Sequence, residues 1–326
     1  MFDSFYNRVF AFLSSFVVTL VMGYLLIPAL KKLKFGQTIR DDGPSSHLKK
    51  AGTPTMGGIM FLIPTMIILC LLSMKYKDTL PLLLLTIGFG TVGFIDDYIK
   101  VIRKSKNGLN ALQKLFGLLT VSTVFTLYLV YVAKIGTEII LPLSGMSGTV
   151  TIPVWFYIPL TVFVLLATTN AVNLTDGVDG LAAGVTLIIM AFFTFIASVI
   201  SESSGAPLYA AIIAGGCLGF LIFNSYPAKV FMGDCGSLAL GGAVAASAII
   251  LKIHWILLFA GVIYVIEALS VIIQVVSYKT RKKRVFKMAP LHHHFELSGW
   301  KERKIAGVFY IVTIIFCAIS IVLLFL

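Results

Sequence analysis

The sequence predicts an all-α polytopic membrane protein with about ten transmembrane helices. Of its 326 residues, 58% are hydrophobic and only 12% are charged, whereas about 25% of the residues in a soluble domain are charged. The mean hydropathy is +0.98. Apolar runs follow one another so closely that no stretch remains for a separate soluble domain. We therefore expect one integral-membrane domain over residues 1–326.

Ten apolar runs are long enough to cross a bilayer, which takes about 17 to 25 helical residues. They cover residues 9–30, 57–74, 80–101, 115–134, 153–172, 180–200, 207–223, 236–253, 255–278 and 305–325. The first run is too long for a signal-peptide core and lacks a small-x-small cleavage motif, so we expect it to remain a helix. The segment 137–151 alternates β-branched residues near glycines and is able to form a small extracytoplasmic β-hairpin.

The basic residues predict how the helices are oriented. Most of the 26 lysines and arginines fall in loops that share one side when the chain crosses the membrane ten times. Because the positively charged loops of membrane proteins face the cytoplasm, both termini are predicted to be extracytoplasmic. Anionic lipid at the cytoplasmic surface accounts for the net charge of +12, and we expect no nucleic-acid partner.

Most of the few acidic residues are predicted to lie at cytoplasmic helix ends. Asp96 and Asp97 follow one apolar stretch and precede further apolar residues, so the pair lies near the membrane boundary. Ionised groups at this depth usually mark a functional site and need a partner such as a cation. The structural alternative is a solvated helix end with Lys100 and Arg103 nearby.

A second polar cluster, NLTDGVDG at 173–180, directly precedes an apolar run. If the cluster continues as helix, Asn173, Asp176 and Asp179 share one face at i, i+3 and i+6 spacing. The structural alternative is capping, because a carboxylate stabilises a helix N-terminus. Capping requires one acid, however, and this segment supplies an Asn and two Asp flanked by glycines.

A third cluster is the polar loop NSYPAKVFMGDCGS at 224–237, which leads into another apolar run. Glycines on both sides of Asp234 permit turns and close approach to a phosphate or sugar. The carboxylate of Asp234 supplies the hard oxygen ligand that Mg²⁺ prefers. A plain Asp-Gly turn is the structural alternative.

Three adjacent histidines occur in APLHHHFE at 289–296, after a very basic stretch at 279–287. Consecutive side chains on a helix point in different directions, so we do not expect a tripod metal site. The functional interpretation is donation to phosphate oxygens, and the structural one is a membrane-surface loop with incidental histidines. Carboxylates, cations and glycine turns on one face together indicate a Mg²⁺-assisted reaction of a phosphate compound.

These segments, with GTPTMGG at 52–58 and DDY at 96–98, resemble the phospho-N-acetylmuramoyl-pentapeptide-transferase (MraY) family of polyprenyl-phosphate N-acetylhexosamine-1-phosphate transferases. The resemblance spans nearly the whole chain. It implies transfer of phospho-MurNAc-pentapeptide from UDP-MurNAc-pentapeptide to undecaprenyl phosphate, which gives lipid I and UMP in peptidoglycan synthesis. It also implies a Mg²⁺ cofactor, the bacterial cytoplasmic (inner) membrane with a cytoplasmic active site, inhibition by nucleoside antibiotics such as tunicamycin, and a homodimer as a candidate assembly.

Matching motifs carry the family's functional residues to this chain. Asp234 would be the surest Mg²⁺ ligand, with Asp96 and Asp97 close to the metal and the lipid phosphate, and with Asp176 as a further metal ligand. Phe231 would stack on uracil, and either Lys49 or Lys50 would assist phosphate binding. The full set implied for substrate binding is Asn173, Asp176, Asp179, Asn224, Phe231, Lys114, Lys49, Lys50, Gln274, His292 and His293.

Two other functions agree with parts of the sequence. A sister transferase that uses UDP-GlcNAc would share the aspartate motifs, although the HHHFE and GTPTMGG forms resemble the muramoyl branch. A cation-coupled transporter would also place acids at membrane depth. Against transport, the acids gather on one face, and Glu267 is the main charge within a predicted span.

Overall fold

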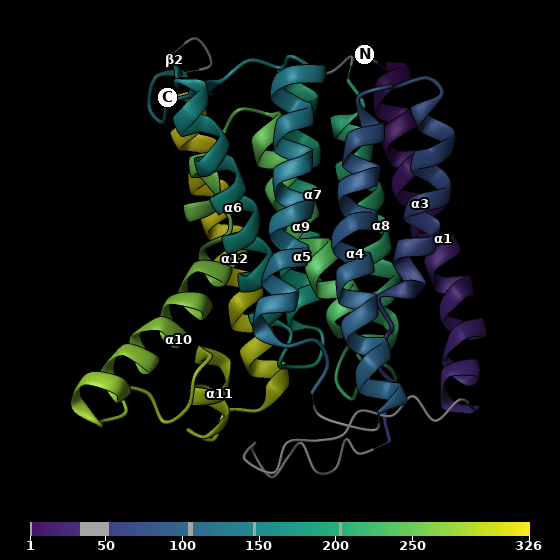
Figure 1. Cartoon of the computed structure of the whole chain (residues 1–326). Helices are drawn as coiled ribbons and strands as arrows, with labels where there is room; N and C mark the ends of the chain where they lie inside the picture. The colour runs from purple at the N-terminus through teal and green to yellow at the C-terminus, as the bar shows by residue number, and fades with distance from the viewer. Residues whose placement is uncertain (1, 33–51, 104–106, 146–147, 202–203) are drawn as a thin grey trace.

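The computed structural model describes residues 2–32, 52–103, 107–145, 148–201 and 204–326. In these ranges the chain forms a bundle of long helices that run between two ends of the molecule (Figure 1). Nine helices of the described chain are long and apolar enough to cross a membrane. The predicted all-α polytopic membrane fold is therefore confirmed.

Within the described ranges, ten apolar helices lie where the sequence predicts apolar runs. They are α1 (Phe2–Lys32), α3 (Ile59–Ser73), α4 (Thr79–Ile102), α5 (Ala111–Leu127), α6 (Val154–Thr175), α7 (Leu181–Ile200), α8 (Ala206–Asn224), α9 (Gly233–Ile250), α10 (Val262–Arg281) and α12 (Glu302–Phe325). The π-helical turn Tyr128–Val132 extends α5. Helix α3 differs from the prediction because its 15 residues rise about 22 Å, less than the roughly 30 Å hydrocarbon core of a bilayer.

Shorter elements connect these helices. Strand β1 (Glu138–Ile140) pairs antiparallel with β2 (Thr149–Thr151), so the hairpin predicted within 137–151 is present. A 3₁₀ segment, His254–Leu258, separates α9 from α10. The ninth predicted run consequently becomes helical only at Val262. A short helix, α11 (Leu291–Glu296), carries the three histidines.

Helices α8 and α9 form the centre of the bundle. In each, 83% of the most apolar window is buried, compared with 22% in α10. The sequence of α9, GDCGSLALGGAVAASAII, consists largely of small residues, which let helix backbones approach closely in lipid. Asp234, in the first turn of α9, is therefore attached to one of the two most enclosed helices.

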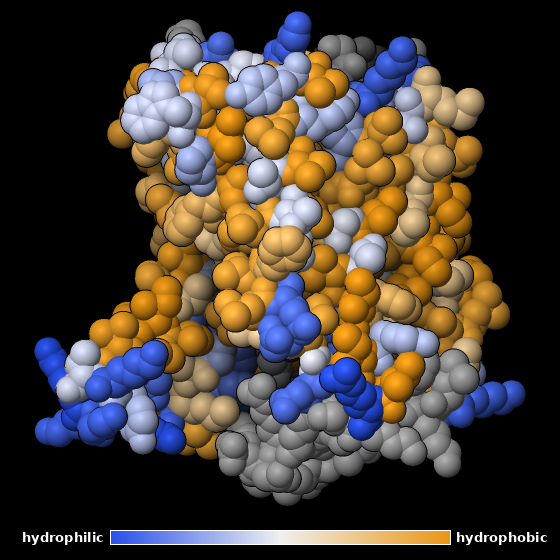
Figure 2. Space-filling model, in the orientation of Figure 1, coloured by the Kyte–Doolittle hydropathy of each residue, from blue (hydrophilic) through white to orange (hydrophobic). Residues whose placement is uncertain are grey.

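The surface has the character of a membrane protein. Figure 2 shows a broad hydrophobic band, with hydrophilic residues gathered at the end of the molecule where α10 terminates. Both labelled chain ends and the β-hairpin lie at the opposite end (Figure 1). This same-side placement agrees with an even number of crossings, and the assignment of that side to the cell exterior stays a prediction.

Cysteine labelling tests the orientation. In a Cys70→Ser background, a membrane-impermeant maleimide should label Thr151→Cys in the hairpin of intact spheroplasts. It should label Lys283→Cys, beyond α10, only after permeabilisation, because positively charged loops face the cytoplasm. Both positions are exposed, and the other native cysteines are buried. The reverse labelling pattern would contradict the predicted orientation.

Candidate functional site

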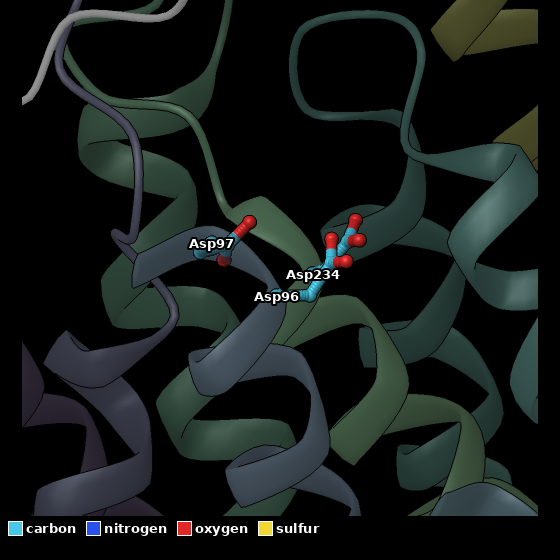
Figure 3. A group of neighbouring side chains, drawn as sticks. All are labelled: Asp96, Asp97 and Asp234. Atoms are coloured by element: carbon cyan, nitrogen blue, oxygen red, sulfur yellow. The ribbon is translucent and has the colours of Figure 1, made fainter. Parts of the chain in front are cut away.

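Three carboxylates meet where α4 ends and α9 begins. Asp96 and Asp97 lie near the end of α4, and Asp234 lies in the first turn of α9. One oxygen from each carboxylate lies within 4.8 Å of the others, and Figure 3 shows the carboxylates of Asp96 and Asp234 side by side. Both Asp96 and Asp97 are only 3% exposed. Residues from two helices that are far apart in the sequence thus form one acidic cluster, which we call the carboxylate cluster.

Two lysines offset part of the negative charge of this carboxylate cluster. The Lys100 Nζ atom lies 2.5 Å from Asp96 Oδ2, 3.0 Å from Asp234 Oδ2 and 3.9 Å from Asp97 Oδ1. Lys114, from α5, places its Nζ 3.0 Å from the same Asp234 Oδ2. Buried carboxylates need such partners because removing an ion from water costs several kcal/mol. Lys100, considered in the sequence only as a neighbour of a helix end, is part of the site.

Asn173 holds Asp234 and Lys114 in place. Its Nδ2 donates to Asp234 Oδ1 at 2.9 Å and to Ser237 Oγ at 2.8 Å. Its Oδ1 accepts from Lys114 Nζ at 3.2 Å. All polar atoms of the Asn173 side chain therefore orient the site, and the participation of Ser237 has no signal in the sequence other than its place in the 224–237 motif.

Backbone amides hold the other two acids. Leu109 N donates to Asp96 Oδ1 at 2.7 Å, and Cys235 N donates to Asp97 Oδ2 at 3.0 Å. Each aspartate therefore has one oxygen fixed by the main chain. Such contacts set the carboxylate orientation before any substrate or metal binds, which is the usual basis of electrostatic catalysis.

The cluster depends on a very close approach of α4 to α9. A Cβ atom on Gly93 would lie 2.2 Å from the backbone oxygen of Asp234. Gly233 adopts a φ of +77°, and a Cβ there would lie 2.5 Å from Asp97 Oδ2. Only glycine avoids both the steric conflict and the strained left-handed backbone. The glycines around the acids thus let the carboxylates approach one another.

The segment 173–180 is not one helix. Helix α6 ends at Thr175 and α7 begins at Leu181, so the expected shared helical face of the 173–180 motif is wrong. The backbone leaves the helical conformation at Asp176, the C-cap of α6, whose ψ is +42°, and Gly180, with a φ of +79°, is the N-cap of α7. Asp176 lies in this turn, where burial, followed by the negative charges of Asp234, Asp97 and Asp179, raises the pKa of its carboxyl group. Asp176 is therefore close enough to the cluster to experience its charge.

Asp179 and Asn224 join two loops. Asp179 Oδ2 accepts from Ala228 N at 2.9 Å. Asn224 Oδ1 accepts from Gly180 N at 3.0 Å, while Nδ2 donates to Val230 O at 3.0 Å. These contacts tie the 176–180 turn to the loop that precedes Asp234. Both residues thus hold these two loops together, and their predicted contact with the substrate stays a prediction.

The first motif supports the same loop. Phe231 N donates to Pro54 O at 2.8 Å, and Phe231 O accepts from Gly57 N at 2.8 Å. The GTPTMGG segment thus fixes the backbone beside the predicted uracil-stacking residue. Lys49 and Lys50, also predicted to contact substrate, lie outside the described residues.

The three histidines of α11 engage three different partners. His292 Nδ1 lies 3.2 Å from Glu267 Oε2, and His293 Nδ1 lies 2.7 Å from Glu296 Oε2. His294 Nδ1 accepts a backbone N–H from the preceding loop at 3.1 Å. The three Nδ1 atoms thus bond to different groups, although the rings of His292 and His293 stay in contact, with centroids 4.1 Å apart. The sequence marked Glu267 as a charge within a predicted span but did not reveal that its partner is His292.

Gln274, the weakest of the predicted substrate contacts, binds the backbone of the loop that follows α10. Its Oε1 accepts from Val285 N at 2.9 Å and from Phe286 N at 3.0 Å, and its Nε2 donates to Phe286 O at 3.0 Å. These bonds fold the 284–287 loop back on α10. Gln274 thus shapes the approach to the histidine helix.

The carboxylate cluster fits a divalent cation. Asp96, Asp97 and Asp234 are the group of potential metal-ligating side chains in the described chain. Mg²⁺ is typically held by one or two carboxylates together with substrate phosphates and water. The nearby ammonium groups of Lys100 and Lys114 are also suited to phosphate oxygens. The arrangement can therefore hold a metal and a phosphate compound together.

Comparisons with known proteins agree with this chemistry. The Glycosyl transferase family 4 profile matches residues 79–252, and phospho-N-acetylmuramoyl-pentapeptide-transferase signature 1 matches residues 50–62. A phospho-N-acetylmuramoyl-pentapeptide-transferase from Acetivibrio thermocellus is 55% identical over 96% of this chain and 94% of its own. The chain belongs to this transferase family.

Two further relatives extend the match. The phospho-N-acetylmuramoyl-pentapeptide-transferase of Clostridium kluyveri is 48% identical over 97% of this chain and 98% of its own. That of Halalkalibacterium halodurans is 49% identical over 95% of each chain. The present protein is therefore an enzyme, a phosphosugar transferase of the membrane, and the resemblance found in its motifs is confirmed.

Gly93→Ala should separate the acids of this transferase. The added Cβ cannot fit against the Asp234 backbone, so α4 and α9 should move apart, and activity should fall by about 100-fold, as expected for a misplacement near 1 Å. Gly307→Ala is the control, because a Cβ there meets no atom within 4 Å. Phosphosugar transfer by the two purified variants is the measurement. Equal, near-normal rates would show that the close helix contact is not required.

Asp176→Asn should stabilise the metal-free protein as the pH rises. The raised pKa of Asp176 means that the folded state binds more protons than the unfolded state, so ionisation costs stability as the pH increases through the folded-state pKa. Thermal unfolding in detergent with EDTA should show a melting-temperature advantage of the variant that grows as the pH rises above the ordinary carboxyl pKa of about 4.

Glu138→Gln is the control for this experiment, because the pKa of Glu138 is shifted in the opposite direction to that of Asp176. A hydrogen bond from Lys252 lowers the pKa of Glu138, so its ionised form favours the folded state and its contribution is lost at low pH. The variant should be no more stable than the wild type at pH 8. An Asp176→Asn advantage that did not depend on pH would contradict the electrostatic explanation.

Proposed function

We propose that this protein transfers phospho-MurNAc-pentapeptide from UDP-MurNAc-pentapeptide to undecaprenyl phosphate, giving lipid I and UMP. The observation that carries the proposal is the convergence of three aspartates and two lysines from α4, α5 and α9. Relatives with 48 to 55% identity over nearly the whole chain carry the name of this transferase. We further propose that the reaction takes place at the cytoplasmic face of the bacterial inner membrane.

The location of the cluster suits a reaction between a soluble donor and a lipid acceptor. Asp96 and Asp97 follow an apolar stretch of α4 and are followed by Ile99, Val101 and Ile102. The acids therefore lie near the membrane boundary, where the phosphate of a polyprenyl lipid and a water-soluble nucleotide can meet. A site in open water would not be accessible to the lipid head group.

Mg²⁺ is the proposed cofactor, with Asp234, Asp97 and Asp176 as its protein ligands. The close oxygen atoms of the carboxylate cluster support the metal site, and Asp176 lies within electrostatic reach of the other two. Bound Mg²⁺ would neutralise the charge of the diphosphate and its leaving group. Asn173 holds Asp234 and the Cys235 amide holds Asp97, so these two ligands require little rearrangement.

The acceptor phosphate attacks the donor phosphorus directly in the proposed mechanism. The second pKa of a phosphate monoester is near about 6, so much of the acceptor is dianionic at neutral pH and needs little help from a base. Asp96 is ion-paired with Lys100, and Asp97 accepts from Cys235 N. Both contacts stabilise the ionised carboxylates and lower their nucleophilicity, which favours a role in placing the metal and the acceptor phosphate over a phospho-aspartate intermediate.

Lysines and histidines are the proposed phosphate-binding groups. Lys100 and Lys114 reach the same Asp234 oxygen and would stabilise the negative charge of transferring phosphates. His292 and His293 would bind the donor's phosphates, and Phe231 would stack on uracil. Binding of nucleoside antibiotics such as tunicamycin and formation of a homodimer stay predictions.

Family membership favours this reaction over its rivals. The signature at residues 50–62 is that of the muramoyl transferases, which argues against UDP-GlcNAc as the donor. A cation-coupled transporter would need polar groups along a path across the bilayer, whereas the three acids and their lysines gather at one end of α4 and α9.

Purified protein with UDP-MurNAc-pentapeptide, undecaprenyl phosphate and Mg²⁺ should release UMP. EDTA or omission of the polyprenyl phosphate should abolish release, because metal and acceptor are both required. UDP-GlcNAc, assayed in parallel, should give little product. Preference for UDP-GlcNAc would support the sister reaction, and flux in liposomes without UMP release would support transport.

Asp234→Asn should reduce turnover by at least about 100-fold, the usual cost of removing one electrostatic contact to the transition state. The amide is nearly the same size, so the protein should still fold in detergent, but it cannot supply the charge that binds Mg²⁺ and pairs with Lys100 and Lys114. UMP release and monodispersity are the measurements. Near-normal turnover would remove Asp234 from the metal site.

A further inference from the structure

Glu267 is a buried acid inside the membrane-spanning helix α10. Its side chain is 0% exposed, and the surrounding helix VIYVIEALSVIIQVV is almost entirely apolar. An ionisable residue within a span is costly and usually has a functional reason. Glu267 does not belong to the carboxylate cluster, and the mechanism above assigns it no role.

Both oxygens of Glu267 contact one residue of a different helix. Glu267 Oε1 accepts from His292 N at 3.2 Å, and Oε2 lies 3.2 Å from His292 Nδ1. Imidazole is ordinarily more basic than a carboxylate, so the shared hydrogen belongs on Nδ1 and Glu267 is the acceptor. Two contacts from one carboxylate restrict both the position of the α11 backbone and the rotation of the ring.

The other nitrogen of His292 faces the substrate site. Nε2 is buried and has no hydrogen-bond partner within the described part of the chain. A Cβ atom on Gly177 would lie 2.2 Å from Nε2, so this nitrogen points at the turn that also carries Asp176. Buried polar atoms normally have a hydrogen-bond partner. That Nε2 has none in the described chain indicates that a polar atom of a ligand bonds to it.

We propose that Glu267 is a positioning residue. Its carboxylate accepts the Nδ1 hydrogen of His292 and, when the ring carries a hydrogen on both nitrogens, directs Nε2–H to an oxygen of the donor's diphosphate. The inference rests on the proposed function, because that function supplies an anionic donor beside Asp176. A carboxylate behind a functional histidine selects one ring nitrogen for bonding and fixes the ring orientation. Glu267 performs this role from α10, whereas the neighbouring His293 finds its carboxylate on its own helix, at Glu296.

The arrangement explains why the histidine helix docks where it does. Helix α11 has only six residues, which is too short to be stable without tertiary contacts. Glu267 anchors its second residue, His292, by the main chain as well as by the side chain. A purely structural anchor would need only the backbone contact, and it would not require the ring to leave Nε2 unpaired beside the substrate site.

Kinetics of four variants test the proposal: Glu267→Gln, Glu267→Asp, His292→Gln and the Glu267→Gln/His292→Gln double variant. In Glu267→Gln, kcat/KM for the nucleotide donor should fall between about 10- and 100-fold, as for other carboxylates behind functional histidines. The KM for undecaprenyl phosphate should stay within about twofold. Glu267→Asp keeps a carboxylate and should recover part of the loss.

The double variant separates positioning from a general effect on the fold. If Glu267 acts through His292, the double variant should be no slower than His292→Gln. Ser270→Ala is the matched control, because Ser270 is also buried in α10 and donates to the Glu267 backbone oxygen without touching His292. It should retain wild-type kinetics. Losses that multiply in the double variant would overturn the proposal.

Nitrogen-15 spectra of histidine-labelled protein give an independent readout. The wild type should show a His292 signal with hydrogen on Nδ1, assigned by its absence in His292→Gln, and this signal should shift or disappear in Glu267→Gln but not in Ser270→Ala. An unchanged signal in a folded Glu267→Gln protein would also refute the proposal. Failure of the wild type to release UMP would refute the proposed function instead.

Discussion

The ionic contact of Asp234 with Lys100 and Lys114 is the constraint on which the site depends. Asp96 and Asp97 approach Asp234 near the membrane boundary, where three uncompensated carboxylates would repel one another. The two ammonium groups offset this repulsion, and Asn173 keeps both Asp234 and Lys114 in register. The carboxylates are suited to a metal ion and the ammonium groups to a diphosphate. The ion pairs that stabilise the packing of these helices thus also place the groups that the proposed reaction needs.

A second set of contacts supports these residues from behind. Asn224 ties the 176–180 turn to the loop before Asp234, while the GTPTMGG segment holds the same loop through backbone hydrogen bonds. Glu267 and His292 extend this support to α11. Polar residues in the motifs therefore divide into those that face the cluster and those that hold the loops, although both kinds look alike in the sequence.

Much of the architecture was predictable because lipid imposes simple rules on a chain. The ten apolar helices and the β-hairpin lie where length and residue pattern indicated. The exceptions have local causes: α3 is short, and the helical path from Asn173 toward Asp179 ends at Asp176, where the backbone leaves the helical conformation. The aspartate motifs also identified the acidic cluster, since charges are rare in an apolar chain and therefore conspicuous.

The sequence by itself determined the class of fold, the positions of the spans and the acids that matter, because hydrophobicity and charge act over short stretches of chain. Tertiary structure alone decided which lysine neutralises which aspartate, that Asn224 and Gln274 bind loop backbone, and that Glu267 pairs with His292. These contacts join separate helices, and their existence depends on how closely α4, α9 and α10 pack. No spacing along the chain encodes that distance.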